Sequence, residues 1–448
     1  MKTLRYWFIF ISAFLSRFKF VLLGSVLLGV FIFLFSSKMS RFVSFFQTGN
    51  TIGVVDKFNL DNLPLSIQQE ISVGLTRLDP NNQPIPGIAT SWESQENGRV
   101  WIFHLGDYKW QDGSKIQSKD INYQFKDAKK EVIDAKTIKF TLNKDPYVPF
   151  PTAVTRPVFK RGLIGAGDWK VSGLTTITGQ FSRSLTLVNI KTDAKKTYRF
   201  YDTEDIALTA YKLGQVRQLN GIIDPKDLST WNNARIDIKT NEDRYVGIFL
   251  DMQDKVASDK NIRQALAYAI DKDEFPEKRA ISIISPKSWV FNPQVKDYKY
   301  NPDRAKELLK NVPDDVKKGL HINLVTLPSL LPVADKIKKN WDDVGLPTSI
   351  QVINAPPDDF QALLWIQSIP PDPDQYSLWH STQTGTNITN YGPPAKESPR
   401  IDKLLEDGRR TLDPEARKSI YYDFQRFLLE DLPVIPLFYP VTYTITRK

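Results

Sequence analysis

The residues best suited to chemistry in this chain form an acidic turn, Pro371-Asp372-Pro373-Asp374. Two carboxylates at this spacing can in principle act as a general acid–base pair or receive a cation. The flanking prolines favour a structural role instead, in which each carboxylate caps the backbone of a turn. We therefore expect a structural turn rather than catalysis from this pair.

No other motif in the sequence supports an enzyme. It contains no G-x-S-x-G elbow, H-E-x-x-H pair, phosphate loop or G-x-G-x-x-G, and Gly165-Ala166-Gly167 is expected to be a turn. His104, His321 and His380 lie far apart, so no local metal motif exists. The chain has no cysteine, which excludes disulfides, a thiolate metal site and a lipid-modified cysteine anchor. We expect no catalytic residue, no metal and no cofactor.

The positive charge is concentrated at the N-terminus. The chain of 448 residues carries a formal charge of +9, from 60 basic and 51 acidic residues. Residues 1–41 hold six bases and no acid, so the remainder has 54 bases against 51 acids and a charge of only +3. The remainder has no long run of one sign, which argues against a nucleic-acid partner.

The N-terminal segment predicts a membrane anchor. Residues 20–37 form an 18-residue run without a charge. As a helix, this run just spans a hydrocarbon core of about 30 Å. Four bases precede it and two follow closely, which predicts an N-terminus inside the cell and an extracytoplasmic C-terminal part, at the cell surface or in the periplasm. A cleaved signal peptide is the alternative, although no clean A-x-A site follows the run.

The rest of the chain alternates between strand and helix patterns. The alternation and length of the apolar runs predict strands over residues 100–105, 137–142, 185–191, 245–250 and 322–326. Apolar residues at helical spacing, with caps, predict helices over 261–270, 303–310, 334–344 and 417–429. Such a mixture over this length indicates α/β lobes.

Six stretches, in one fixed order, resemble the family of dipeptide-, oligopeptide- and nickel-binding proteins of ABC importers. The first runs from GLTRLD at Gly74 through Trp110 to QDGS at 111–114, and the second is the predicted helix SDKNIRQALAYAIDKDE from Ser258. The other four are YNPDRAKELL from Tyr300, the predicted helix and strand at 341–353, PDPD at 371–374 and DLPVIPL from Asp431. The resemblance covers nearly all of the exported part.

This resemblance implies a two-lobed periplasmic binding protein fold of class II, the oligopeptide-binding type, with a reduced extra lobe. We predict a membrane anchor over residues 1–44, a first lobe over 45–242 that includes the shortened extra subdomain, and a second lobe over 243–448. The lobes are expected to close over a ligand by a hinge motion, and a monomer is expected for this family.

The resemblance also implies the ligand-binding residues. The segment nearest the ligand corresponds to residues 365–379, and the leading G-L motif lies in the first lobe. The predicted ligand contacts are Trp365, Ile369, Pro371, Asp372, Asp374, Trp379, Gly74 and Leu75. Peptide-binding members carry an aspartate, which receives the α-amine of the peptide, where this chain has Ile369.

The function implied is that of the extracytoplasmic solute-binding component of a peptide-type ABC importer. It would capture an extended peptide or similar small solute between its lobes and deliver it to an ABC permease, held near the lipid bilayer by its N-terminal helix. The alternative from another class is a membrane-tethered ligand sensor or peptide-holding surface protein without a transporter. A metal-chelate ligand has little support from three scattered histidines.

Overall fold

The computed structural model describes residues 18, 19, 25, 50–59, 62–177, 181–357, 359–392 and 398–448. The predicted membrane helix over 20–37 lies outside these residues, except for Ser25. Within the described ranges, no helix has the length and apolar character needed to cross a bilayer.

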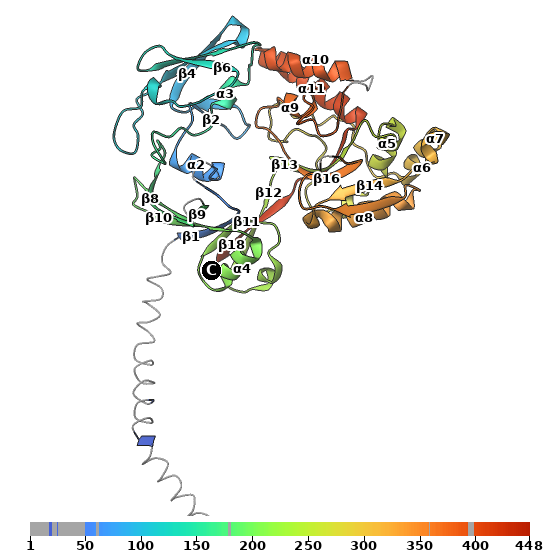
Figure 1. Cartoon of the computed structure of the whole chain (residues 1–448), viewed down its shortest axis with the longest axis horizontal. Coiled ribbons are helices and arrows are strands. Elements are labelled where there is room, and N and C mark those ends of the chain that lie inside the picture. The colour runs from blue at the N-terminus through green and yellow to red at the C-terminus, as the bar shows by residue number, and fades with distance from the viewer. Residues whose placement is uncertain are drawn as a thin grey trace, which may run out of the picture.

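The first lobe is built on a seven-stranded sheet whose order is β12-β18-β11-β1-β10-β9-β8 (Figure 1). Its strands, in chain order, are β1 Asn50–Val55, β8 Trp169–Ile177, β9 Phe181–Asn189, β10 Lys195–Tyr201, β11 Gln218–Ile222, β12 Ala234–Thr240 and β18 Val441–Arg447. Helix α4, Glu204–Lys212, links β10 to β11, both of which run parallel to β1. Helix α2, Leu65–Ile71, buries Ile67 and Ile71 beneath the same sheet.

A small subdomain with its own core extends from this lobe. Its four-stranded sheet, in the order β4-β5-β7-β6, consists of β4 Ala89–Gln95, β5 Val100–Leu105, β6 Ala128–Val132 and β7 Thr137–Leu142. The ribbon of β2 Thr76–Leu78 and β3 Pro84–Pro86 and the short helix α3 Phe150–Ala153 complete it. Phe103, Phe140 and Phe150 are buried and their ring centroids lie 5.1–6.2 Å apart, so aromatic packing holds the subdomain together.

The second lobe contains a five-stranded sheet in the order β15-β14-β16-β13-β17. Its strands are β13 Arg244–Leu250, β14 Ile322–Thr326, β15 Thr348–Val352, β16 Ala362–Ser368 and β17 Val434–Phe438. The helices of this lobe are α5 Lys260–Ala269, α6 Pro302–Lys310, α7 Asp314–Lys317, α8 Leu331–Asp343, α9 Tyr376–Trp379, α10 Ser398–Arg410 and α11 Pro414–Asp431. Two separate cores, one containing Trp341 and the other Tyr421 and Phe424, pack within the lobe.

Short 3-10 turns complete the described elements. They are η1 Glu96–Gly98, η2 Ser118–Asp120, η3 Lys226–Thr230, η4 Lys272–Glu274 and η5 Pro328–Leu330.

Helix α5 shows how the sequence determines an element. The Asp259 carboxylate accepts hydrogen bonds from the amides of Asn261 and Ile262, at 2.8 and 3.2 Å, and so caps the first turn. Ile262 and Leu266 on the predicted apolar face are fully buried. This confirms the predicted helix, displaced by one residue at each end.

The two lobes are joined by two adjacent connections. Residues 241–243 lead from β12 to β13, and residues 439–440 lead from β17 back to β18. The amide of Asn241 donates to the Pro440 carbonyl at 2.9 Å, and its side chain donates to the Thr442 hydroxyl at 3.1 Å. The predicted boundary after residue 242 falls within this pair, while β18, which the predicted second lobe included, belongs to the first sheet. Paired short connections of this kind suit a hinge.

A buried lysine links stability of the second lobe to pH. Lys272 Nζ donates to the carbonyls of Ala267 and Tyr298, each at 2.6 Å. Burial lowers the pKa of Lys272 to about 7, and the positive charge of Arg279 acts in the same direction. The unfolded chain keeps this proton until about pH 10. Between these values the unfolded state binds more protons than the folded state, so stability rises with pH.

We therefore expect wild-type protein to gain stability relative to Lys272→Met from about pH 7 to about pH 10, by up to about 1.4 kcal/mol per pH unit. Melting temperatures of both proteins, measured at one-unit steps from pH 5 to pH 10, test this. Below about pH 6 the difference between them should be constant, because both states of the wild type are protonated there. A difference that stays constant over the whole range would mean that Lys272 titrates at its ordinary pKa.

Candidate functional site

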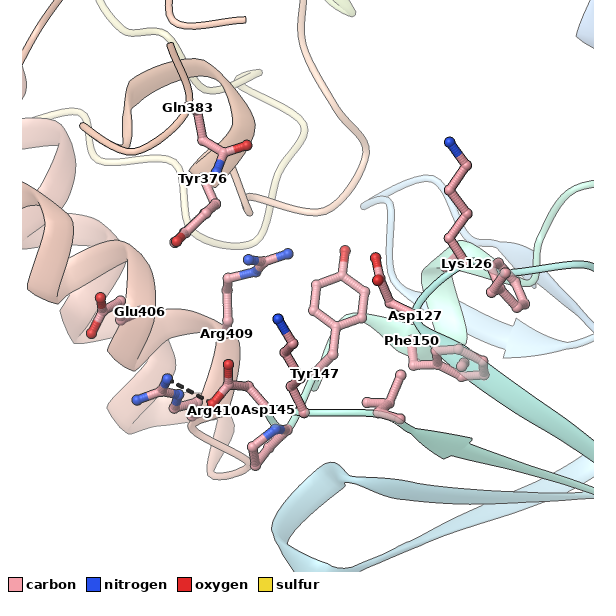
Figure 2. A pocket seen from close by; sticks show the side chains of 16 residues that line it. Lys126, Asp127, Asp145, Tyr147, Phe150, Tyr376, Gln383, Glu406, Arg409 and Arg410 are labelled. Carbon is pink, nitrogen blue, oxygen red and sulfur yellow. Dashed lines mark hydrogen bonds and ion pairs between the residues drawn. The ribbon is translucent and has the colours of Figure 1, made fainter. Parts of the chain in front are cut away.

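A cavity of about 680 Å³ lies between the small subdomain and the second lobe (Figure 2). The subdomain and the segment after it contribute eleven lining residues, Phe125, Lys126, Asp127, Ala128, Leu142, Lys144, Asp145, Pro146, Tyr147, Phe150 and Ala153. The second lobe contributes Tyr376, Gln383, Glu406, Arg409 and Arg410. The cavity therefore exists only while the two parts face each other, which is the geometry expected of a ligand site in a hinged protein.

Arg409, in the last turn of α10, is the central charge of this site. Its guanidinium carbon lies 4.9 Å from the ring centre of Tyr147 and 4.3 Å from that of Tyr376. Its Nε lies 3.1 Å from Oδ2 of Asp374, whose side chain is 8% exposed. Figure 2 shows Arg409 reaching from the helix toward Tyr147 across the cavity. The guanidinium is thus paired in charge with Asp374 and lies against two aromatic rings, although its buried Nε makes no hydrogen bond of good geometry.

Two further contacts join the lobes beside Arg409, and we call this set of three the latch. The Arg409 carbonyl accepts a hydrogen bond from the Val148 amide at 2.8 Å. Arg410 Nη2 lies 3.0 Å from Asp145 Oδ1, in an ion pair whose side chains are 46% and 67% exposed. The third contact is that of Arg409 with Tyr147. In Figure 1 the latch region, where α10 approaches the subdomain, lies at the opposite end of the lobes from β12 and β18.

Asp372, the other carboxylate of the acidic turn, is paired with an arginine of the second lobe. Both terminal nitrogens of Arg417 contact Asp372, at 2.6 and 3.1 Å, and the two side chains are only 7% and 13% exposed. Arg417 Nε also donates to the Gly408 carbonyl at 2.8 Å. The carboxylates additionally cap the turn: Asp372 accepts from the Asp374 amide and Asp374 from the Tyr376 amide. Each acid of the turn therefore has an arginine of this chain as its partner.

The electrostatics of the turn follow from its burial. Burial raises the pKa of Asp374, the charge of Arg409 offsets part of that rise, and neighbouring Asp372 adds to it. Burial also raises the pKa of the Tyr147 phenol far above its usual value, with a contribution from the negative charges of Asp374 and Asp372. Tyr147 and Asp374 thus lie in surroundings where an unpaired charge is costly.

The structure divides the predicted contact residues between two places. Gly74 and Leu75 lie in the first lobe, where Leu75 is fully buried and a Cβ on Gly74 would come within 2.6 Å of the Thr155 backbone. The other predicted residues lie on β16, on the loop after it and, for Trp379, at the end of α9. Ile369 is 7% exposed and its amide donates to the Asp243 carbonyl, at the hinge, at 2.7 Å.

The tryptophans of the predicted segment belong to the second-lobe core. Trp379 is 2% exposed, its ring stacks on Phe249 at 6.3 Å, and its Nε1 donates to Gln375 at 2.7 Å. Trp365 is partly buried against the same core, and Pro371 is exposed. None of the eight predicted residues lines the cavity, although Asp374 reaches it through Arg409. Their roles as ligand contacts stay predictions.

Sequence reasoning missed the cavity residues themselves. Arg409 and Arg410 end a helix, where basic residues are common for electrostatic reasons alone. Tyr147 and Asp145 follow a strand in a segment with no motif. Nothing in their spacing indicates that they face each other, because 261 residues or more separate Arg409 from Tyr147 and Asp145 in the chain.

Comparisons with known proteins identify the family. The family model of bacterial extracellular solute-binding proteins, family 5, matches residues 83–131 and 194–388, which is more than half of the chain. The chain belongs to this family. The dipeptide-binding protein of Escherichia coli K12 is 22% identical, over 85% of this chain and 84% of that protein. Di/tripeptide-binding protein 1 of Pseudomonas aeruginosa UCBPP-PA14 is 24% identical, over 81% of this chain and 82% of its own length.

Two solved structures share the fold of this chain. NikZ from Campylobacter jejuni, in complex with Ni(L-His), superimposes with a TM-score of 0.72 at 21% identity, covering 89% of this chain and 94% of that one. AppA from Bacillus subtilis, in complex with a nonapeptide, gives a TM-score of 0.67 at 19% identity, covering 89% and 95%. These similarities confirm the two-lobed α/β architecture predicted for this member of the solute-binding family. In the part of this chain that the structure describes, no three acidic or histidine side chains are grouped as metal ligands.

Arg417 and Arg410 should differ in how much each contributes to stability. Replacing Arg417 by Met leaves the Asp372 carboxylate buried without its partner, which costs about 3–5 kcal/mol for pairs of this type. The matched change Arg410→Met removes an exposed ion pair and should cost less than about 1 kcal/mol. Melting temperatures of the two variants at pH 7 measure the contrast. Equal losses would mean that the Asp372–Arg417 pair is solvated in solution.

Proposed function

We propose that this family 5 protein captures a peptide or similar small solute between its hinged lobes and delivers it to the permease of a peptide-type ABC importer. One observation carries the proposal: the cavity is lined by side chains of both the first-lobe subdomain and the second lobe. Opening the hinge would separate these walls and release whatever the cavity holds. The names of the relatives, which refer to dipeptides and di- or tripeptides, support the peptide class.

Binding would act on an equilibrium between open and closed lobes. The hydrogen bond from Asn241 to Pro440 pairs the hinge connections at 241–243 and 439–440, and the walls of the cavity would move apart about this pair. A solute that contacts both walls has more contacts in the closed form, and this difference shifts the equilibrium toward closure. The permease would then recognise the closed form.

The predicted contact segments suit recognition of an extended ligand. Residues 365–371 continue the exposed end of β16, and Gly74 and Leu75 precede β2 in the other lobe. The carbonyls of Gly74 and Leu75 and the amide of Ile369 already have partners in the protein. Main-chain pairing with a peptide would therefore fall to residues 365–368 of β16, which pair with β13 on one side only, and it would hold a peptide without reading its side chains.

We place this protein outside the cytoplasm, held at the membrane by residues 20–37 and acting as a monomer. The family of extracellular solute-binding proteins supports an extracytoplasmic site of action. No catalytic step enters the proposal, because both carboxylates of the acidic turn are occupied by arginines.

Native mass spectrometry of the full-length chain, purified from its host in detergent under non-denaturing conditions, tests the proposal. A closed binding protein retains ligand, so we expect a series of added masses equal to mixed short peptides. Peptide addition should also raise the melting temperature of ligand-free protein.

Two other outcomes would lead to different conclusions. A single small-molecule mass would keep solute capture but exclude peptides as the class. Protein that carries no added mass and is not stabilised by a peptide library would contradict capture and favour a tethered structural role.

A further inference from the structure

The surroundings of Arg409 have the composition of a binding site for a cation. Two tyrosine rings and one carboxylate surround the guanidinium, with ring centres at 4.9 and 4.3 Å and a carboxylate oxygen at 3.1 Å. Aromatic faces combined with an acid form the general arrangement by which proteins hold organic cations. We call Tyr147, Tyr376 and Asp374 the cation cage.

The cage is assembled from both lobes. Tyr147 belongs to the first-lobe subdomain, whereas Tyr376 and Asp374 belong to the second lobe, and Tyr147 and Tyr376 line the cavity. A cation in the cage therefore contacts both walls of the cavity at once. In this structure that cation is Arg409, supplied by the chain itself.

We infer that Arg409 occupies the cation cage as an internal substitute for a cationic group of the solute, so that the protein selects solutes whose end at this turn is neutral or anionic. The inference deepens the proposed capture of a solute and rests on it for the identity of the ligand. The cage itself is a feature of the chain and can be tested without any solute.

The remaining charges near the turn agree with this selectivity. The other acid, Asp372, is already held by Arg417 on both oxygens. At position 369 the side chain is aliphatic and 7% exposed, in the apolar core. An ammonium group brought to this turn would therefore have to displace an arginine or remain unpaired in a desolvated site, and both are costly.

The opposite wall of the cavity offers positive charge. Among the described residues that line the cavity, Lys126 and Lys144 have no ion-pair partner, and Asp127 beside them and Glu406 on the second lobe have no lysine or arginine partner. These four charges balance over the cavity, while the two lysines offer a partner to a carboxylate on the subdomain wall. The selectivity against an ammonium therefore rests on the acidic turn, where Arg409 and Arg417 already pair with both acids.

Chemical rescue tests the cage directly. In the full-length chain, Arg409→Ala should lose thermal stability, and millimolar ethylguanidinium chloride should restore part of it as the free cation fills the cage. We expect a saturable rise in Tm of about 1–2 °C, beyond that given by the same concentration of sodium chloride. The rescue should weaken as the pH falls, because burial raises the pKa of Asp374 and its protonated form does not attract a cation.

Arg410→Ala is the matched control, because it removes the neighbouring guanidinium, which is paired with Asp145 outside the cage. This variant should show no saturable response to ethylguanidinium. Arg409→Lys, which keeps a cation in the cage, should also show none. Rescue of both alanine variants to the same extent, or of neither, would overturn the assignment of the cage.

Selectivity is tested with one peptide in two forms, tetra-alanine with a free amino terminus and its N-acetylated equivalent. Titration calorimetry of the wild type should give an affinity for the acetylated form at least equal to that for the free amine. In Arg409→Ala the ratio should shift toward the free amine by about tenfold, because the vacated acid can now pair with it.

The outcomes of the two experiments separate the inference from the proposed function. A wild type that prefers the free amine tenfold, or an unchanged ratio in Arg409→Ala, would overturn the selectivity. If neither peptide binds any variant, capture of peptides fails, while the response to ethylguanidinium still decides whether the cage exists.

Discussion

The antiparallel pairing of β12 with β18 is the constraint on which the two-lobed form depends. Seven residue pairs, from Ala234–Arg447 to Thr240–Val441, join the strand that leaves the first sheet to the strand that returns to it. The two connections between the lobes, at 241–243 and 439–440, leave this ladder side by side, so they cannot move independently. The second lobe is therefore restrained to rotation about one short axis, and its far end must approach or leave the small subdomain as a unit.

At that far end the chain places charge where water is largely excluded. Buried carboxylates are tolerated only when they are paired or hydrogen-bonded, and the acidic turn has both kinds of partner. Arg417 satisfies Asp372 within one lobe, whereas Arg409 satisfies Asp374 while also contacting a ring of the other lobe. The pairing that stabilises the turn thus also extends across the cavity, and the same arginine serves both purposes.

The sequence is informative where one segment determines its own structure. The strands at 100–105, 137–142 and 322–326 were predicted at their observed bounds, since alternating or continuous apolar runs depend only on neighbours in the chain. The predicted helix at 261–270 also forms, and within it Arg263 is buried and donates to three backbone carbonyls.

The site is harder to predict, because its parts are far apart in the chain. The turn at 371–374 was found from its two carboxylates, but the arginines that neutralise them lie on α10 and α11, with no spacing to link them to it. The return of residues 441–447 to the first sheet has the same character, because the assembled fold sets which strands pair with them. Long-range pairing of this kind leaves no local signal in one sequence.

The latch by itself stabilises the closed form only weakly. An exposed ion pair such as Arg410–Asp145 contributes at most about 1 kcal/mol, one backbone hydrogen bond about 0.5–1.5 kcal/mol, and a partly exposed cation–π contact about 0.5–2 kcal/mol. Their sum of a few kcal/mol is comparable to the difference between open and closed states in proteins that respond to ligands. A solute must then supply only a similar free energy to change the populations. Arg409 already contacts Tyr147 on one wall of the cavity and Tyr376 on the other. A solute therefore gains most from interactions that the chain does not make for itself, and Lys126 and Lys144 on the subdomain wall offer them.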